Sequence, residues 1–203
     1  MHTLSTSFIL GYHGCDRDVA ERILAGDKFI PSTNDYDWLG HGIYFWEANP
    51  RRGMEFAQEI ARRKRGASRV LTPAVVGAVV DLGLCLDLTT SDGIEQARLA
   101  YNGLVAVAAK SSTGELPENN RDGLRRPLDC AVLNMVHAIR EADGFRPIDT
   151  VKGTFIEGEP IYRNASFFAK THIQICVRNS ECIKGVFRVP QSLLEPPSTV
   201  ANM

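Results

Sequence analysis

Hydrophobic and polar residues alternate along two short stretches near the start of the chain. In FILGYHG (residues 8–14), Tyr12 falls on one side and His13 on the other. In GIYFW (residues 42–46), Tyr44 and Trp46 share one side. A period of two flanked by glycines is typical of β-strands. We therefore predict a strand at each stretch, each next to a glycine-rich turn where the backbone can approach a neighbour closely.

A spacing of three to four between apolar residues predicts four helices. Asp16 is a suitable N-cap for the first helix, which Gly26 would end. Asn49 followed by proline predicts the start of the second. The segment 92–110 predicts a third helix, and Asp129 would cap a fourth.

The remaining pattern predicts further strands and two irregular segments. Runs rich in β-branched residues lie at 74–83, 171–177 and 183–189. Residues 111–127 are polar and rich in Gly, Asn and Pro, which indicates a loop. The tail 191–203 carries two prolines and is expected to be flexible. We predict one α+β domain before this tail.

Composition and charge narrow the class of protein. The formal net charge is −1, which gives no overall reason to expect a polyanionic partner. A basic run, Arg62 to Arg65 with Arg69, is interpreted as a solvated helix face. Five cysteines without a CxxC pair argue against a disulfide framework or a structural zinc site. With no signal peptide and no long apolar run, we expect a cytoplasmic protein without membrane contact.

Several motifs together resemble a known family. They are YHG at 12–14, an apolar-Pro-Ser step at 30–32, GxGIYF at 40–45 and a following helix that carries Phe56. This set resembles the ADP-ribosyltransferases, in the branch that contains poly(ADP-ribose) polymerase and diphtheria toxin. The resemblance implies two packed antiparallel sheets around an NAD cleft. The catalytic domain would span residues 1–190, with an insertion at about 92–146.

The family's functional residues transfer to matching positions. The catalytic His and Tyr of the family correspond to His13 and Tyr44. The third group, commonly Glu, matches Gln174 best, which is an amide and cannot act as a base. Related toxin branches carry an ExE motif instead, which leaves Glu157 and Glu159 as an alternative.

The resemblance also implies how NAD would be held. His13 would bond the adenosine ribose, and backbone groups of Gly14 would bond the carboxamide. Ser32 lies in the loop beside the adenosine half. Tyr44 and Phe56 would sandwich the nicotinamide ring. No GxGxxG motif or P-loop is present, which disfavours a Rossmann or phosphate-cradle mode of binding.

The function implied is mono-ADP-ribosyl transfer from NAD to a macromolecular acceptor, protein or nucleic acid, because a chain-elongating enzyme would need the glutamate. By analogy with small bacterial members, the protein would be a toxin or a phage-defence effector, with an antitoxin protein as a possible partner. Two alternatives stay open: an NAD glycohydrolase, and a catalytically inactive module that binds NAD or ADP-ribose.

Overall fold

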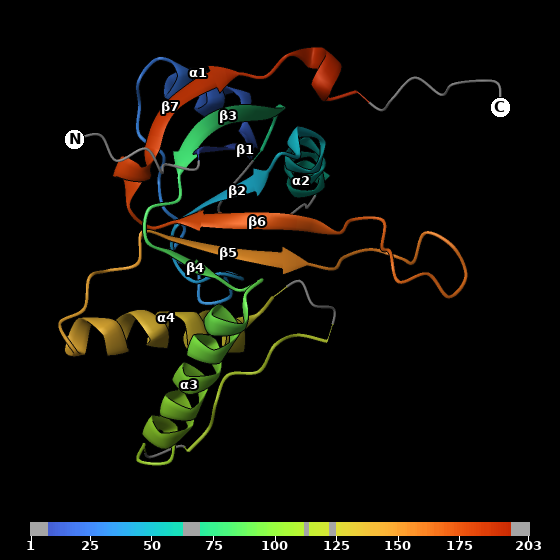
Figure 1. Cartoon of the computed structure of the whole chain (residues 1–203). Coiled ribbons are helices and arrows are strands. Elements are labelled where there is room, and N and C mark those ends of the chain that lie inside the picture. Colours follow the sequence, from blue (N-terminus) through green and yellow to red (C-terminus); the bar gives the residue numbers. More distant parts are fainter. Residues whose placement is uncertain (1–7, 63–69, 112–113, 122–124, 196–203) are drawn as a thin grey trace.

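A computed structural model describes residues 8–62, 70–111, 114–121 and 125–195 (Figure 1). Four helices are α1 (Arg17–Leu24), α2 (Pro50–Arg62), α3 (Ser91–Ala108) and α4 (Pro127–Ala142). Seven strands are β1 (Phe8–Asp16), β2 (Ile43–Glu47), β3 (Pro73–Asp81), β4 (Cys85–Asp87), β5 (Thr150–Phe155), β6 (His172–Val177) and β7 (Ile183–Arg188). The protein is therefore of mixed α+β class, as the sequence predicts.

The strands form one seven-stranded sheet in the order β4-β5-β6-β2-β1-β3-β7. The expectation of two separate packed sheets is therefore wrong. The two halves are nevertheless joined narrowly, because β1 and β2 pair only at Gly11↔Glu47 and Tyr12↔Trp46. In contrast, β1 pairs with β3 from Phe8 to Asp16. The junction between β1 and β2 thus has the fewest paired residues in the sheet, and we call it the seam.

Helices α1 and α2 pack on opposite faces of the sheet. Cys15 of β1 packs in a core cluster with Ala20 and Ile23 of α1, whereas Tyr12 packs with Met54 of α2. Neighbouring residues of a strand point to opposite faces, so these contacts define two sides. We call them the α1 face and the α2 face.

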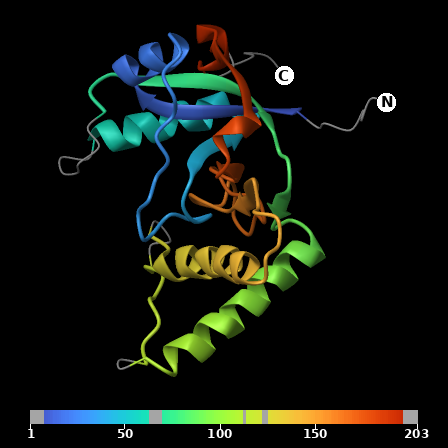
Figure 2. The ribbon, with the colours of Figure 1, turned by 90° about the vertical axis from the view of Figure 1, so that its left-hand side faces the viewer.

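Helices α3 and α4 lie together at the end of the molecule away from α1 and α2 (Figures 1 and 2). Leu133 of α4 and Ala100 of α3 share a core cluster with Leu86 of β4, Val151 of β5 and Cys176 of β6. Partly buried Tyr44 packs against the same cluster. The segment predicted as an insertion therefore covers part of the α2 face.

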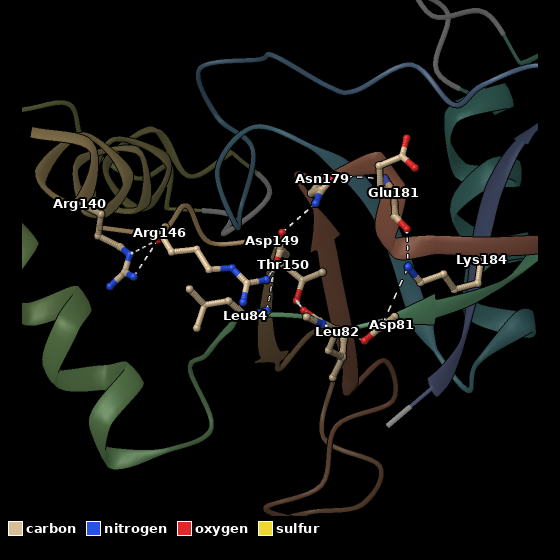
Figure 3. A network of polar contacts seen from close by, with 11 residues as sticks. Asp81, Leu82, Leu84, Arg140, Arg146, Asp149, Thr150, Asn179, Glu181 and Lys184 are labelled. Carbon is tan, nitrogen blue, oxygen red and sulfur yellow. Dashed lines mark hydrogen bonds and ion pairs between the residues drawn. The ribbon is translucent and has the colours of Figure 1, made fainter. Parts of the chain in front are cut away.

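A polar network fixes the β4 edge of the sheet (Figure 3). The buried Asp149 carboxylate accepts hydrogen bonds from the Leu84 backbone N–H (2.9 Å), from Asn179 (2.8 Å) and from Arg146 (2.7 Å). The Thr150 hydroxyl donates to the Leu82 carbonyl at 2.6 Å. These bonds tie the short parallel strand β4 to β5 and to the end of β6.

Most helix caps follow the prediction, with one exception. Asp16 accepts a bond from Asp18 N, and Asn49 accepts one from Arg52 N at 3.0 Å. Asp129 does not cap α4, because that helix already begins at Pro127. Within the predicted tail, Gln191–Leu193 form a 3-10 helix. Residues 196–203 and the basic positions 63–65 and 69 lie outside the described residues.

Candidate functional site

His13 and Tyr44 meet at the junction between β1 and β2, but their side chains point to opposite faces. The His13 ring contacts Phe29 (5.2 Å) and Phe45 (5.8 Å) on the α1 face. Tyr44 precedes Phe45 in the strand and packs on the α2 face. The two rings therefore do not line one slot on a single face of the sheet. What the structure brings together is the His13 imidazole and the Tyr44 backbone.

The imidazole of His13 is held in one tautomer. Its Nδ1 lies 2.9 Å from the Tyr44 carbonyl oxygen, which can only accept a hydrogen bond, so Nδ1 carries the proton. Burial lowers the pKa of His13, which keeps the ring neutral. Nε2 is then a bare acceptor, with no hydrogen-bond partner among the residues that the structure describes. It is suited to accept a bond from a ligand hydroxyl.

The phenol of Tyr44 is already satisfied by its own loop. Its oxygen accepts from Leu39 N at 2.8 Å and donates to the Gly40 carbonyl at 2.7 Å. Burial raises the pKa of this phenol far above its ordinary value, so it stays protonated. Tyr44 therefore cannot serve as an acid or base, and only its ring face remains for a ligand.

Gln174 shares the α2 face with Tyr44. It lies opposite Trp46 across the β2–β6 ladder, and Cys176, two residues on, lies opposite Tyr44. Only 9% of Gln174 is exposed. Its Nε2 lies 3.0 Å from Nε2 of His172, which is also buried. The structure thus brings Gln174 near the predicted tyrosine and adds His172 beside it.

Phe56 packs its ring against that of Trp46. Its ring lies 4.8 Å from that of Trp46, and no ring contact with Tyr44 is found within the described residues. Both rings are on the α2 face, where α2 crosses the end of β2. Phe56 thus packs against Trp46, and its predicted place on the other side of a nicotinamide ring from Tyr44 stays a prediction.

The two glutamates of the alternative motif lie in different surroundings. Glu157 accepts a hydrogen bond from Arg52 Nη2 at 2.8 Å and lies 3.7 Å from Nδ1 of His172. Arg52 is only 5% exposed and lies 5.9 Å over the Trp46 ring. Glu159 is exposed. Only Glu157 of the pair therefore reaches the group around Gln174.

Ser32 and Gly14 border the junction from two sides. Ser32 pairs with Gly42 through both backbone groups, and its hydroxyl accepts a bond from Asn34 at 2.7 Å. Gly14 packs against α2, because a Cβ there would lie 2.1 Å from the Gly53 carbonyl oxygen. The close approach expected at Gly14 is thus an approach to α2.

Three residues of this region were not predicted as functional: Trp46, Arg52 and His172. The alternation of the strands already placed Trp46 on the same face as Tyr44, and His172 on the same face as Gln174. The sequence could therefore have indicated both residues. No pattern joined Arg52 to Glu157, since 105 residues separate them. In the described ranges no cluster of three or more His, Cys, Asp or Glu could hold a metal ion. Nor does any described helix have the length and apolar character needed to cross a membrane.

Comparisons with known proteins add little. No protein-family model matches the chain, and no solved structure matches it. A protein of Methanocaldococcus jannaschii, whose name states only that it is uncharacterized, is 53% identical over 36 residues. That match covers 18% of this chain and 17% of the relative. The function is therefore inferred from the residues themselves.

Proposed function

We propose that the chain binds NAD at the junction of β1 and β2 and transfers one ADP-ribose unit to a macromolecular acceptor. The finer fold assignment, an ADP-ribosyltransferase fold, is part of this proposal. The observation that carries it is the bond from His13 Nδ1 to the Tyr44 carbonyl, at the point where β1 and β2 stop pairing. This bond leaves His13 Nε2 as an acceptor for a ribose hydroxyl.

The α2 face supplies complementary groups. The Tyr44 hydroxyl is bonded within its own loop, so the group that Tyr44 would offer to a flat ring is its partly buried aromatic face. An aromatic face over the cationic nicotinamide contributes roughly 0.5–2 kcal/mol. Gln174 lies on the same face with an amide that can bond a ribose hydroxyl. Because His13 points to the other face, the dinucleotide would have to bridge the seam between the two strands.

The reaction needs orientation more than covalent help. The bond between C1′ of ribose and the nicotinamide nitrogen breaks, and its electron pair stays on that nitrogen, which leaves as neutral nicotinamide. A nucleophile of the acceptor bonds to C1′ and loses its proton. Fixed dipoles stabilise the oxocarbenium-like transition state between these events. A neutral Gln174 can position the ribose but cannot deprotonate an acceptor, which favours a single transfer.

One observation favours a rival function. The strand position of the family's glutamate holds an amide, and the nearby Glu157 is bound to Arg52. A module that binds NAD without turnover would need no carboxylate there. Hydrolysis with water as acceptor would use the same groups as transfer. All three functions can be separated by one experiment.

That experiment follows nicotinamide release from labelled NAD, with and without a cell lysate that is then digested with nuclease or protease. Release that requires lysate, with label in a digestible macromolecule, supports transfer. Release in buffer alone supports hydrolysis, and binding without release supports the inactive module. Tyr44→Ala is expected to abolish the signal, whereas Tyr101→Ala, on the exposed side of α3, serves as the matched control.

A further inference from the structure

A chain of three groups runs along the end of β6 toward the proposed site. Nδ1 of His172 lies 2.7 Å from the Lys170 carbonyl oxygen, and its Nε2 lies 3.0 Å from Nε2 of Gln174. A carbonyl oxygen can only accept, so Nδ1 of His172 must carry the proton. In the neutral ring Nε2 is then an acceptor, and it must receive a hydrogen bond from the Gln174 NH₂ group.

This chain decides which end of the Gln174 amide faces outward. With NH₂ bonded to His172, the carbonyl oxygen Oε1 is directed away from it. In the described part of the chain, Oε1 has no hydrogen-bond partner. It is not fully buried either, so a ligand can reach it. A glutamine without such a neighbour could present either end to a ligand. Here the neighbour permits one orientation only.

Aromatic packing prevents the His172 ring from turning over. The ring lies 5.8 Å from that of Phe155 at 29°, 6.4 Å from Trp38 at 25°, and 6.5 Å from Trp46. The side chain of His172 has no exposed surface. A flip of the ring would break the bond to the Lys170 carbonyl and leave a buried N–H without a partner, which is costly.

We infer that His172 is a positioning residue that holds the Gln174 carbonyl oxygen toward the ligand, as an acceptor for a ribose hydroxyl. This inference rests on the proposed function for the identity of the ligand. In the resembling family, a single glutamate carboxylate commonly stands at this position. Here His172 and Gln174 together would bind the ribose hydroxyl. The Gln174 amide can present its carbonyl oxygen to the ligand only while Nε2 of His172 carries no proton.

The inference implies a specific dependence on pH. A second proton on His172 would turn Nε2 into a donor, so the amide would have to rotate and present NH₂ to the ligand. Burial lowers the pKa of His172, and Arg52 lowers it further. The Lys170 carbonyl, Glu157 and Glu55 act in the opposite direction. Ligand affinity should therefore be constant near neutrality and fall in the acid range below pH 6.5.

Nitrogen-15 NMR of the labelled protein tests the tautomer without any ligand. We expect Nδ1 of His172 to be protonated and Nε2 to be bare at neutral pH, with a titration midpoint below that of an ordinary histidine. The opposite tautomer, or a doubly protonated ring at pH 7.5, would overturn the inference even if the protein binds NAD.

Calorimetric titration with NAD between pH 5 and pH 8 tests the consequence. In the wild type, affinity should fall with the midpoint found for His172 by NMR. His172→Phe keeps the packing but removes the acceptor, and should weaken binding about tenfold at neutral pH and abolish the acid step. His137→Phe, which replaces a histidine of α4, is the matched control and should keep the step.

The outcomes separate the two proposals. Tight binding by His172→Phe with the wild-type acid step would overturn the positioning role and leave the proposed function intact. No binding of NAD by the wild type would overturn the proposed function, and the role toward a ribose hydroxyl with it. Gln174→Glu provides a second test, which can be carried out even if His172→Phe folds poorly. Its carboxylate should stabilise the doubly protonated ring and move the His172 midpoint to higher pH, and an unmoved midpoint would contradict the contact.

Discussion

The imidazole of His13 donates a hydrogen bond to the carbonyl oxygen of Tyr44 at 2.9 Å, although the two side chains point to opposite faces of the sheet. The bond crosses the seam just beyond the last recorded pair of β1 and β2, Tyr12↔Trp46. It links the α1 face to the α2 face where the sheet is joined most narrowly. A ligand that uses both residues must therefore bind across this seam.

Two substitutions of Tyr44 should distinguish the contribution of its ring from that of its hydroxyl. Tyr44→Phe leaves Leu39 N and the Gly40 carbonyl without their partner, which should lower the free energy of unfolding by about 1–3 kcal/mol. The ring face remains, so NAD binding should persist. Tyr44→Ala removes that face and should abolish binding and turnover. Urea unfolding and nicotinamide release check the two effects, and near-normal turnover of Tyr44→Ala would refute the stacking role.

Two glycines in contact provide a matched pair for testing how α2 is seated. A Cβ on Gly14 would lie 2.1 Å from the backbone oxygen of Gly53, so Gly14→Ala must push α2 away from β1. We expect a loss of at least about 2 kcal/mol in the free energy of unfolding. A Cβ on Gly53 meets nothing closer than 3.5 Å. Gly53→Ala should be neutral or stabilising by up to about 1 kcal/mol, because alanine favours the helix.

Thermal and urea unfolding of both variants measure these changes in the free energy of unfolding. Equal stability of the two alanine variants would mean that the contact between β1 and α2 is looser than the structure has it.

The sequence predicted which residues share a face within a strand, but not how strands align. Alternation alone put Tyr44 with Trp46 and separated Tyr12 from His13. Whether His13 and Tyr44 share a face depends on the register Tyr12↔Trp46, and a shift by one residue would reverse the result. That register is set by long-range pairing, which no local pattern encodes.

The same limit explains what was missed elsewhere. Strand β5 (Thr150–Phe155) contains Gly153 and polar residues, so its local pattern is weak, and its pairing with β4 and β6 determines it. The strands around the candidate site were predicted well because their alternation and flanking glycines are strong. Arg52 and Glu157 meet only through the fold, so their ion pair could not be predicted.

The ranking of the candidate third groups is open to direct test. Gln174 lies on the α2 face with Tyr44, whereas Glu159 is exposed on the loop after β5. Gln174→Ala should therefore reduce nicotinamide release by tenfold or more. Loss of one oriented hydrogen bond can raise the barrier by roughly 1.4 kcal/mol, which corresponds to a factor of ten in rate. Glu159→Ala should change it little. Steady-state release assays compare the two, and the reverse ranking would move the catalytic role to the loop carboxylates.

Acid stability should depend on a histidine outside the site. Both ring nitrogens of His137 are buried and have no hydrogen-bond partner among the described residues. Burial, with Arg178 and Arg140 nearby, lowers the pKa of His137 to about 3. The unfolded chain binds this proton near pH 6.5, so the free energy of unfolding falls as the pH drops from 6.5 toward 3. Each pKa unit contributes about 1.4 kcal/mol.

His137→Leu removes this group and should flatten the acid slope. Urea unfolding midpoints between pH 4 and pH 8 measure it, with the two proteins compared at pH 8, where the imidazole is neutral in both states, as the internal control. An unchanged slope in the variant would show that His137 binds its proton equally well in the folded and the unfolded chain.

The most direct test of the central claim is a crystal structure of the protein with NAD or a non-cleavable analogue. The account predicts the nicotinamide against the Tyr44 ring, one ribose hydroxyl bonded to Nε2 of His13 and another to the Gln174 amide. A dinucleotide bound elsewhere, for example in the cavity of about 270 Å³ between α1 and β7 that Ile23 and Val186 line, would contradict it.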